Sequence, residues 1–309
     1  MQPYHALYQS GELLQRVKEG YRRLVACDLC PHRCGVNRIR GEQGRCRSGF
    51  KPRIASANLH RGEEPPISGS KGSGTIFFSG CTLNCVFCQN FPISQQNSGE
   101  TISTWELARR MLQLQKRGAH NLNLVTPGHW LPQFLAALWL AIPQGFKLPV
   151  VWNSSGYEAM DALQLLDGVV SIYLPDMKYS NEQQAYELSG APGYTAINRA
   201  AVTEMLRQVG QLQVDDHDIA TQGLIIRHLV LPQGRAGSAV TLPWIAEHLG
   251  VDTHIALMSQ YFPAWRATDT AAINRGLTHD EYDAAVAALE DAGLENGWVQ
   301  ELDVERGSV

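Results

Sequence analysis

Apolar residues follow two alternating periods along most of this chain, and the alternation predicts an α/β fold. From residue 73 onward, short continuous apolar runs bounded by turn residues predict buried strands. These runs lie at 75–79, 121–126, 149–153, 171–175, 224–231 and 254–258. Between and after them, apolar residues three to four positions apart predict helices. The helical patterns lie at 104–117, 131–141, 157–166, 200–209, 241–249 and 279–292.

Continuous apolar strands that alternate with helices predict a parallel sheet, because parallel neighbours need a crossover helix and are covered on both faces. Six strand–helix units are present, which is fewer than a closed (βα)8 barrel requires. We therefore predict a partial (βα)6 TIM-like barrel that stays open. It would occupy residues 73–309, together with a C-terminal helix and tail.

Residues 1–72 have a different character, and we predict that they form a separate N-terminal segment. A helical pattern covers 11–21, and a cysteine-rich stretch follows it. Residues 58–74 are rich in Gly, Pro and Ser, which predicts a linker. The expected organisation is a small N-terminal helix and metal-binding segment, followed by the barrel.

Composition narrows the class of protein. The chain has 309 residues, of which 44% are hydrophobic and 18% charged, so it can bury a sizeable core. A net charge of −4 without a long run of one sign argues against nucleic-acid partners and against a polybasic membrane surface. The first ten residues lack an apolar stretch typical of a secretory signal, so we expect a cytoplasmic protein. The most apolar window, 130–151, contains three prolines and predicts a helix, a turn and a strand.

The seven cysteines fall into two groups, and none occurs after Cys88. A disulfide framework usually spreads an even number of cysteines, whereas grouped thiols in a reducing compartment more often bind metal. The first group follows the spacing C-x2-C-x3-C-x11-C and consists of Cys27, Cys30, Cys34 and Cys46. Its segment has little core of its own, so a metal would stabilise it. Four thiolates suit zinc or an iron–sulfur cluster, and both remain open.

The second group comprises Cys81, Cys85 and Cys88, directly after the first predicted strand. This spacing would also place three small apolar residues on one face of a helix, but Gly80 and Asn84 favour a loop. Iron–sulfur clusters are held by cysteine thiolates, commonly four of them. Three thiolates on a four-iron cluster would leave one iron open for another ligand.

Polar residues collect where the other predicted strands end. In α/β barrels and open α/β sheets, ligands bind at the carboxyl ends of the strands. The candidates at these ends are Thr126, His129, Asn153, Ser155, Asp176, Lys178 and Arg227. Structural alternatives exist for some of them: Asp176 and Lys178 would pair with each other, and His129 would cap a helix. Because Arg227 and His228 alternate along a strand, one of them is expected to face the helices.

The second cysteine group resembles a known signature. A C-x3-C-x2-C loop after a strand, with Phe87 directly before its last cysteine, resembles the radical S-adenosylmethionine superfamily. The resemblance covers roughly residues 73–265 and implies a partial barrel and an enzyme of the oxidoreductase class. It implies a [4Fe-4S] cluster on Cys81, Cys85 and Cys88, whose open iron binds the amino and carboxylate groups of S-adenosylmethionine. Cleavage there yields methionine and a 5′-deoxyadenosyl radical, which abstracts hydrogen from a substrate.

Within that superfamily the chain is similar to proteins related to the pyruvate formate-lyase activating enzyme. The matching stretches are 27–34, 153–158, 174–179 and 226–232. Two features depart from the well-studied activating enzymes. Thr126-Pro127-Gly128-His129 stands in place of a Gly-Gly-Glu stretch, and the additional cysteines precede the C-x3-C-x2-C loop instead of following it.

The resemblance also implies which residues contact the cofactor. The implied contacts with S-adenosylmethionine are Phe87, Thr126, His129, Asn153, Ser155, Asp176, Lys178 and Arg227. Phe87 would pack near the adenine, and Thr126 and His129 would replace the missing Gly-Gly-Glu contacts. The planar guanidinium of Arg227 suits a carboxylate.

Three functions follow as hypotheses. In the first, the radical abstracts hydrogen from a glycine of a partner protein, as an activating enzyme does. In the second, the same chemistry acts on a small molecule or a modified residue. In the third, both cysteine groups bind zinc in a non-catalytic interaction protein. The enzyme hypotheses imply S-adenosylmethionine, an electron donor such as flavodoxin or ferredoxin, and in the first case a protein substrate.

Overall fold

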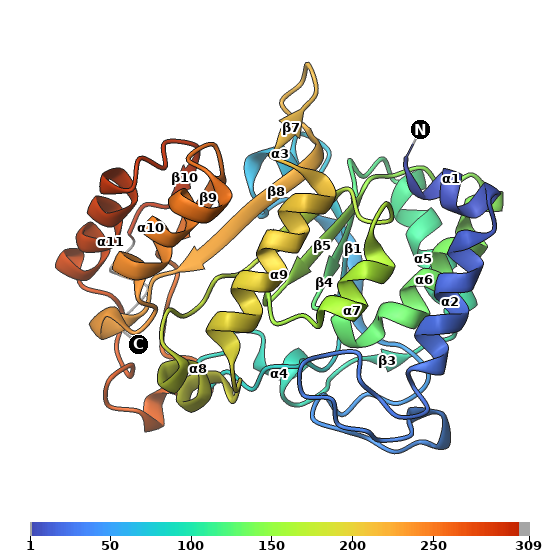
Figure 1. Cartoon of the computed structure of the whole chain (residues 1–309), viewed down its shortest axis with the longest axis horizontal. Coiled ribbons are helices and arrows are strands. Elements are labelled where there is room, and N and C mark those ends of the chain that lie inside the picture. Colours follow the sequence, from blue (N-terminus) through green and yellow to red (C-terminus); the bar gives the residue numbers. More distant parts are fainter. Residues whose placement is uncertain (1, 303–309) are drawn as a thin grey trace.

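The computed structural model describes residues 2–302, and within that range ten strands form one mixed sheet (Figure 1). The strand order is β10-β9-β8-β6-β5-β4-β2-β1-β3, and β7 pairs with β8 outside this path. The strands are β1 Arg53–His60, β2 Ser73–Phe78, β3 Glu100–Thr101, β4 Leu122–Val125, β5 Val150–Ser154, β6 Ile172–Pro175, β7 Gln213–Val214, β8 Ala220–Leu229, β9 His254–Met258 and β10 Gly297–Val299.

The parallel part of the sheet confirms the six predicted strands. Strands β2, β4, β5, β6, β8 and β9 lie side by side in chain order, each parallel to the next. Strand β10 continues the parallel run beyond β9, and β1 and β3 extend the opposite edge with antiparallel pairing. Crossover helices therefore connect neighbouring strands, as the alternating pattern predicted.

The predicted helices are also present. The helices are α1 Tyr4–Gln9, α2 Glu12–Arg22, α3 Pro65–Ser68, α4 Phe91–Ser94, α5 Thr104–Lys116, α6 Leu131–Ala141, α7 Met160–Leu163, α8 Glu182–Ser189, α9 Tyr194–Val209, α10 Ser238–Leu249 and α11 His279–Asp291. Ser103 caps α5, and Thr278 and Glu281 form a capping box on α11, which explains why these two begin where the sequence pattern begins. Helix α7 is shorter than predicted, and α9 begins earlier.

The prediction of a linker at residues 58–74 is wrong. Strand β1 runs through His60 and pairs with β2, and α3 occupies Pro65–Ser68. Proline is tolerated in the first turn of a helix, so the prolines that suggested a linker begin α3 instead. Ile67 of α3 is fully buried in one cluster with Val151 and Ile225, which ties this segment to the sheet.

Helices cover the sheet and bury its strands. The N-terminal helix α2 packs on α6, where Gly20 lies so close to Pro132 that a Cβ on the glycine would come within 3.2 Å of the proline ring. The apolar window 130–151 forms α6, a 3-10 turn and the first residues of β5, as predicted. Within residues 2–302, none of the helices combines the length and the apolar character that spanning a membrane would require.

The loops that leave the carboxyl ends of the parallel strands share one edge of the sheet. The coil between α2 and β1, which carries the first four cysteines, lies along that same edge near α4 and β3 (Figure 1). Both cysteine groups are therefore on one side of the molecule.

Candidate functional site

The second cysteine group lies in the loop that leaves β2. Gly80 opens this loop with φ +83°, and a Cβ there would lie 2.7 Å from the carbonyl oxygen of Cys46. The position therefore requires glycine twice, for its backbone angle and for the close approach. Cys85 is buried and Cys81 and Cys88 are half-buried, and all three are free thiols.

Each of these thiols has a hydrogen-bond partner. The backbone N–H of Leu83 donates to Cys81 Sγ at 3.3 Å, and Ser189 Oγ donates to Cys85 Sγ at 2.9 Å. Cys88 Sγ lies 3.0 Å from Ser94 Oγ.

Burial, together with neighbouring thiols, raises the pKa of Cys81 and raises that of Cys85 to about 11. Lys178 opposes the shift at both thiols. The three thiols therefore lie within electrostatic reach of one another. A bound cationic group would favour their thiolate forms.

A lysine lies beside the three thiols. Lys178 Nζ forms an ion pair with Asp176 Oδ2 at 2.6 Å, just beyond the end of β6. Burial alone would lower the pKa of Lys178, but Asp176 and the thiols of Cys85 and Cys88 outweigh burial, and the pKa is raised. The sequence left open that Asp176 and Lys178 pair with each other, and they do. The pair nevertheless keeps the ammonium charge next to the cysteine loop.

Arg227 faces two carboxylates that the sequence analysis missed. Its Nε lies 2.6 Å from Glu64 Oε1 and its Nη2 lies 2.6 Å from Glu63 Oε2. Its Nη1 also donates to Asn153 Oδ1 at 3.4 Å, which joins the ends of β8 and β5. Glu63 and Glu64 belong to the stretch taken for a linker, and two adjacent carboxylates there were the available signal. A ligand carboxylate would have to share this guanidinium with them.

The neighbouring His228 points the other way, as the strand alternation predicted for one of the two residues. It is fully buried, with Nδ1 2.6 Å from the Met177 carbonyl oxygen and Nε2 2.9 Å from Ser238 Oγ at the start of α10. Burial lowers its pKa to about 4, so it is a neutral structural group at physiological pH.

The remaining candidates lie at the same edge of the sheet and differ in how far they are buried. Phe87 is buried, with its ring 5.9 Å from that of Tyr261 in an edge-to-face contact. Ser155 is half-buried, and its carbonyl oxygen accepts from the hydroxyl of Tyr194 at 2.8 Å. Thr126 has φ +56°, a conformation that is rare for a β-branched residue.

His129 is less accessible than the other candidates. It lies inside a 3-10 turn, buried, with Nε2 3.0 Å from the Ser79 carbonyl oxygen at the end of β2. Burial lowers its pKa to about 3. In this position it supports the start of the cysteine loop.

The four N-terminal cysteines also gather in space. Cys27, Cys30 and Cys46 are buried and Cys34 is exposed. Burial, with a smaller effect of the other three thiols of the group, raises the pKa of Cys30 to about 12. Their mutual influence shows that the coil brings all four sulfurs into one neighbourhood.

A buried arginine lies against one sulfur of this group. Arg38 is only 1% exposed, and its guanidinium forms no ion pair with a carboxylate among the described residues. It donates instead to the carbonyl oxygens of Gly49 and His129, lies over the Trp130 ring, and its Nη1 is 4.0 Å from Cys27 Sγ. A buried cation is costly without a counter-charge, and a metal-bound thiolate would supply one.

Neither cysteine group is arranged around a single ion. Across residues 2–302, no three or more His, Cys, Asp or Glu side chains converge on one ion position. The fit to a metal therefore rests on the donors themselves: three or four neighbouring thiols, with a cation beside each group. That set fits an iron–sulfur cluster, in which different thiolates take different irons.

The two cysteine groups are linked by direct contacts. His32 Nε2 lies 2.8 Å from the carbonyl oxygen of Thr82, next to Cys81. Arg47 Nη2 donates to the carbonyl oxygen of Ser94 at 3.2 Å, and Ser94 is the partner of Cys88. The N-terminal coil therefore rests on the loop that carries the second group.

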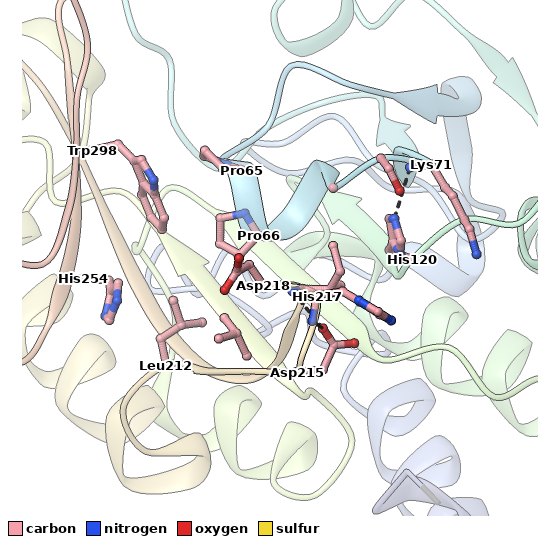
Figure 2. Close-up of a pocket in the computed structure, with 14 residues that line it drawn as sticks. Pro65, Pro66, Lys71, His120, Leu212, Asp215, His217, Asp218, His254 and Trp298 are labelled. Atoms are coloured by element: carbon pink, nitrogen blue, oxygen red, sulfur yellow. Dashed lines mark hydrogen bonds between the residues drawn. The ribbon is translucent and has the colours of Figure 1, made fainter.

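A large cavity lies away from both groups (Figure 2). It has a volume of about 840 Å³ and is found at the amino ends of the strands, where His120 precedes β4, His254 begins β9 and Trp298 lies in β10. No cysteine and no predicted site residue lines it. It is therefore separate from the candidate site.

Comparisons with known proteins give one relative in sequence and weaker likenesses in structure. No family model matches the chain. Over 277 residues it is 33% identical to a Methanocaldococcus jannaschii protein described as "Uncharacterized protein MJ0674", covering 87% of this chain and 75% of the relative.

Two solved structures are also similar. TYW1 with a lysine-pyruvate adduct bound has a TM-score of 0.43 and 13% identity, covering 70% of this chain and 73% of that one. HydG, a maturase of the [FeFe]-hydrogenase, has a TM-score of 0.47 and 13% identity, covering 71% of this chain and 48% of that one. At these scores the two likenesses carry no argument about function.

Proposed function

The chain belongs to the same family as protein MJ0674 of Methanocaldococcus jannaschii, and we propose that it is a radical S-adenosylmethionine enzyme. The observation that carries the proposal is the loop after β2, where three neighbouring thiols at the spacing C-x3-C-x2-C lie beside the ammonium group of Lys178. The open mixed sheet, with its cysteine loop at the carboxyl edge, supports the partial (βα)6 barrel as part of this proposal. The division of the chain at residue 72 is also a proposal. Strand β1 lies before this boundary and pairs with β2 beyond it, so the N-terminal segment is joined to the sheet.

In this proposal Cys81, Cys85 and Cys88 hold a [4Fe-4S] cluster with one iron left for S-adenosylmethionine. A reduced cluster held there would supply the one electron needed to cleave S-adenosylmethionine to methionine and a 5′-deoxyadenosyl radical, which would take hydrogen from the substrate. The hydroxyls of Ser189 and Ser94 hold the sulfurs of Cys85 and Cys88 in orientation.

The chain's charged residues would position the cofactor's carboxylate and amino groups. Lys178 supplies a cation next to the thiols, and Asp176 holds that cation in place. Arg227 joins Asn153 to Glu63 and Glu64, so this network offers both a guanidinium and carboxylates to a zwitterionic ligand. Phe87, Thr126, His129 and Ser155 remain proposed contacts on the evidence of the sequence.

The four N-terminal cysteines would form a second metal site, since four thiolates suit either zinc or an iron–sulfur cluster. A single zinc ion would require these side chains to move together, because they do not converge on one ion position. The buried guanidinium of Arg38 beside Cys27 supports bound thiolates there. Reduction of the first cluster requires an electron donor, for which flavodoxin and ferredoxin are the proposed types.

For the substrate, we favour a glycine of a partner protein, as in the activating enzymes that the motifs resemble. The alternative is a small molecule or a modified residue. Two differences from the well-studied activating enzymes support this alternative. Thr126–His129 replaces their Gly-Gly-Glu stretch, and the additional cysteines precede the C-x3-C-x2-C loop. An EPR search for a glycyl radical on candidate partner proteins separates the two.

The decisive experiment is anaerobic purification followed by assay. We expect brown protein that contains iron and sulfide, and release of 5′-deoxyadenosine when dithionite and S-adenosylmethionine are added. Cys85→Ala should abolish the release, whereas Cys34→Ala, in the other group, should leave iron bound at the loop after β2. Colourless protein that contains only zinc would contradict the proposal and support a zinc-binding interaction protein.

A further inference from the structure

Positive charge is concentrated in the coil that carries the first cysteine group. Residues 27–53 contain seven basic and two acidic side chains, a net charge of +5. The other residues contain 19 basic and 28 acidic side chains, a net charge of −9. This coil is therefore a basic surface on an acidic protein, which gives the molecule a strong charge asymmetry.

The charge is organised around a small pocket at the end of this coil. The pocket has a volume of about 180 Å³, and Arg47, Lys51 and Arg53 line it without any Asp or Glu among the lining residues. The aromatic ring of Phe50, which is 42% exposed, lies at the same place. We call this combination of an exposed ring and three cations, residues 47–53, the basic surface.

A short chain of contacts connects the basic surface to the cysteine loop. Arg47 lines the pocket, and its Nη2 donates to the carbonyl oxygen of Ser94 at 3.2 Å. The hydroxyl of Ser94 is 3.0 Å from Cys88 Sγ. Two residues thus separate the pocket from a sulfur that the proposed function places on the cluster.

We propose that the basic surface is the docking site of an acidic one-electron carrier protein. The inference rests on the proposed function, because it is the cluster on Cys81, Cys85 and Cys88 that needs an electron. In this step the carrier is oxidised by one electron and the cluster is reduced by one, and no bond is formed or broken. Opposite charges steer such encounters and orient the partners, and the exposed ring of Phe50 gives the contact an apolar centre.

A second basic pocket allows a matched control. It lies on α5, lined by Arg110, Lys116 and Arg117, again without Asp or Glu. The end of α5 leads into β4, so Lys116 and Arg117 lie at the amino ends of the strands, away from the cysteine loops. Arg110 is ion-paired with Glu100 and Glu106, so the control uses Lys116 and Arg117, which form no ion pair among the described residues.

The test uses the full-length, cluster-loaded enzyme with flavodoxin as the acidic probe. The variant is Lys51→Glu/Arg53→Glu, Lys51→Glu alone is a milder version, and Lys116→Glu/Arg117→Glu is the control. Binding is measured by titration at low ionic strength, and 5′-deoxyadenosine is measured with flavodoxin or with dithionite as the reductant. Thermal midpoints verify that each variant is folded.

We expect the Lys51→Glu/Arg53→Glu variant to bind flavodoxin at least about tenfold more weakly, with a shallower salt dependence. Its flavodoxin-driven reaction should slow in parallel, while the dithionite-driven reaction and the control variant stay unchanged. Unchanged flavodoxin binding by this variant, or an equal loss in the control, would overturn the docking proposal. Tighter binding of single-stranded DNA than of flavodoxin by the wild-type protein would also overturn the docking proposal. A wild-type enzyme that forms no 5′-deoxyadenosine with dithionite would overturn the proposed function instead.

Discussion

Lys178 Nζ lies 2.6 Å from Asp176 Oδ2. The same ammonium group partly offsets the rise that burial causes in the pKa values of Cys81 and Cys85. The aspartate and the thiols compete for one half-buried cation. If the cysteines hold the proposed cluster, the irons offset much of the thiolate charge, and the lysine is then available to an anionic ligand. This relationship makes Lys178 the first residue to test.

Lys178→Met should weaken S-adenosylmethionine binding by at least about tenfold, because it removes the proposed charge-assisted contact with the half-buried ammonium group. Isothermal titration of the cluster-loaded protein with S-adenosylmethionine would measure the change, and Lys178→Arg should restore part of it. The control is Lys71→Met, an exposed lysine that lines the cavity at the opposite edge of the sheet. Equal affinity in Lys178→Met and wild type would show that Lys178 only neutralises Asp176.

Arg227→Met should destabilise the protein by about 3–5 kcal/mol, because it leaves the buried carboxylates of Glu63 and Glu64 without a cation. The free energy of unfolding in urea measures this loss. Adding Glu63→Gln and Glu64→Gln to the variant should recover most of the stability, since the uncompensated charges are then gone. A triple variant as unstable as Arg227→Met would mean that packing and not charge dominates at this site.

Arg38→Met should lower the metal affinity of the N-terminal cysteine group by about 10–100-fold, as expected for loss of a residue that orients a metal ligand. Metal analysis per chain, after dialysis against a chelator, measures the effect. Arg40→Met is the matched control, because Arg40 lies on the same 3-10 turn but is exposed. Retention of the metal in Arg38→Met would assign Arg38 a packing role on Trp130 alone.

Gly80→Ala should disturb the cysteine loop through both its backbone angle and the 2.7 Å approach of a Cβ to Cys46. Gly118 has a similar φ of +86°, but a Cβ there would meet no atom within 4 Å. Gly118→Ala therefore measures the cost of the backbone angle by itself, which is about 1 kcal/mol. We expect Gly80→Ala to lose more stability than this control and to bind less iron, and equal losses would argue against a tight contact.

Glu158 should make the stability of the protein depend on pH. Burial raises the pKa of its carboxyl group to about 7, above the ordinary value of 4.5 expected in the unfolded chain. Between these two pH values the folded protein holds a proton that the unfolded chain releases. The free energy of unfolding should therefore fall by about 3 kcal/mol as the pH rises from about 4.5 to about 7, and stay constant above that. Urea unfolding between pH 5 and pH 8 should show this slope in the wild type and lose it in Glu158→Gln, and an unchanged slope in the variant would assign it to other groups.

Most secondary structure could be predicted because its signals are local. Buried parallel strands appear as continuous apolar runs, and α6 begins and ends where its pattern does. The stretch at 58–74 was misjudged because its Gly and Pro residues indicated a linker. The two elements found there, β1 and α3, are stabilised by contacts with residues outside the stretch, which the local pattern does not show. Strand β1 depends on pairing with β2, and α3 depends on the burial of Ile67.

The sequence by itself determined the alternation of strands and helices, the two cysteine groups and the polar strand ends, since each is a pattern over neighbouring residues. Only the tertiary structure decided which charges meet. Glu63 and Glu64 reach Arg227 from more than 160 positions away, and Arg38 becomes a buried cation beside Cys27 only when the coil folds onto Trp130. The packing of the N-terminal coil on the cysteine loop is likewise tertiary. Such contacts join segments that are distant in the chain, and their cost or benefit depends on burial, which no local pattern specifies.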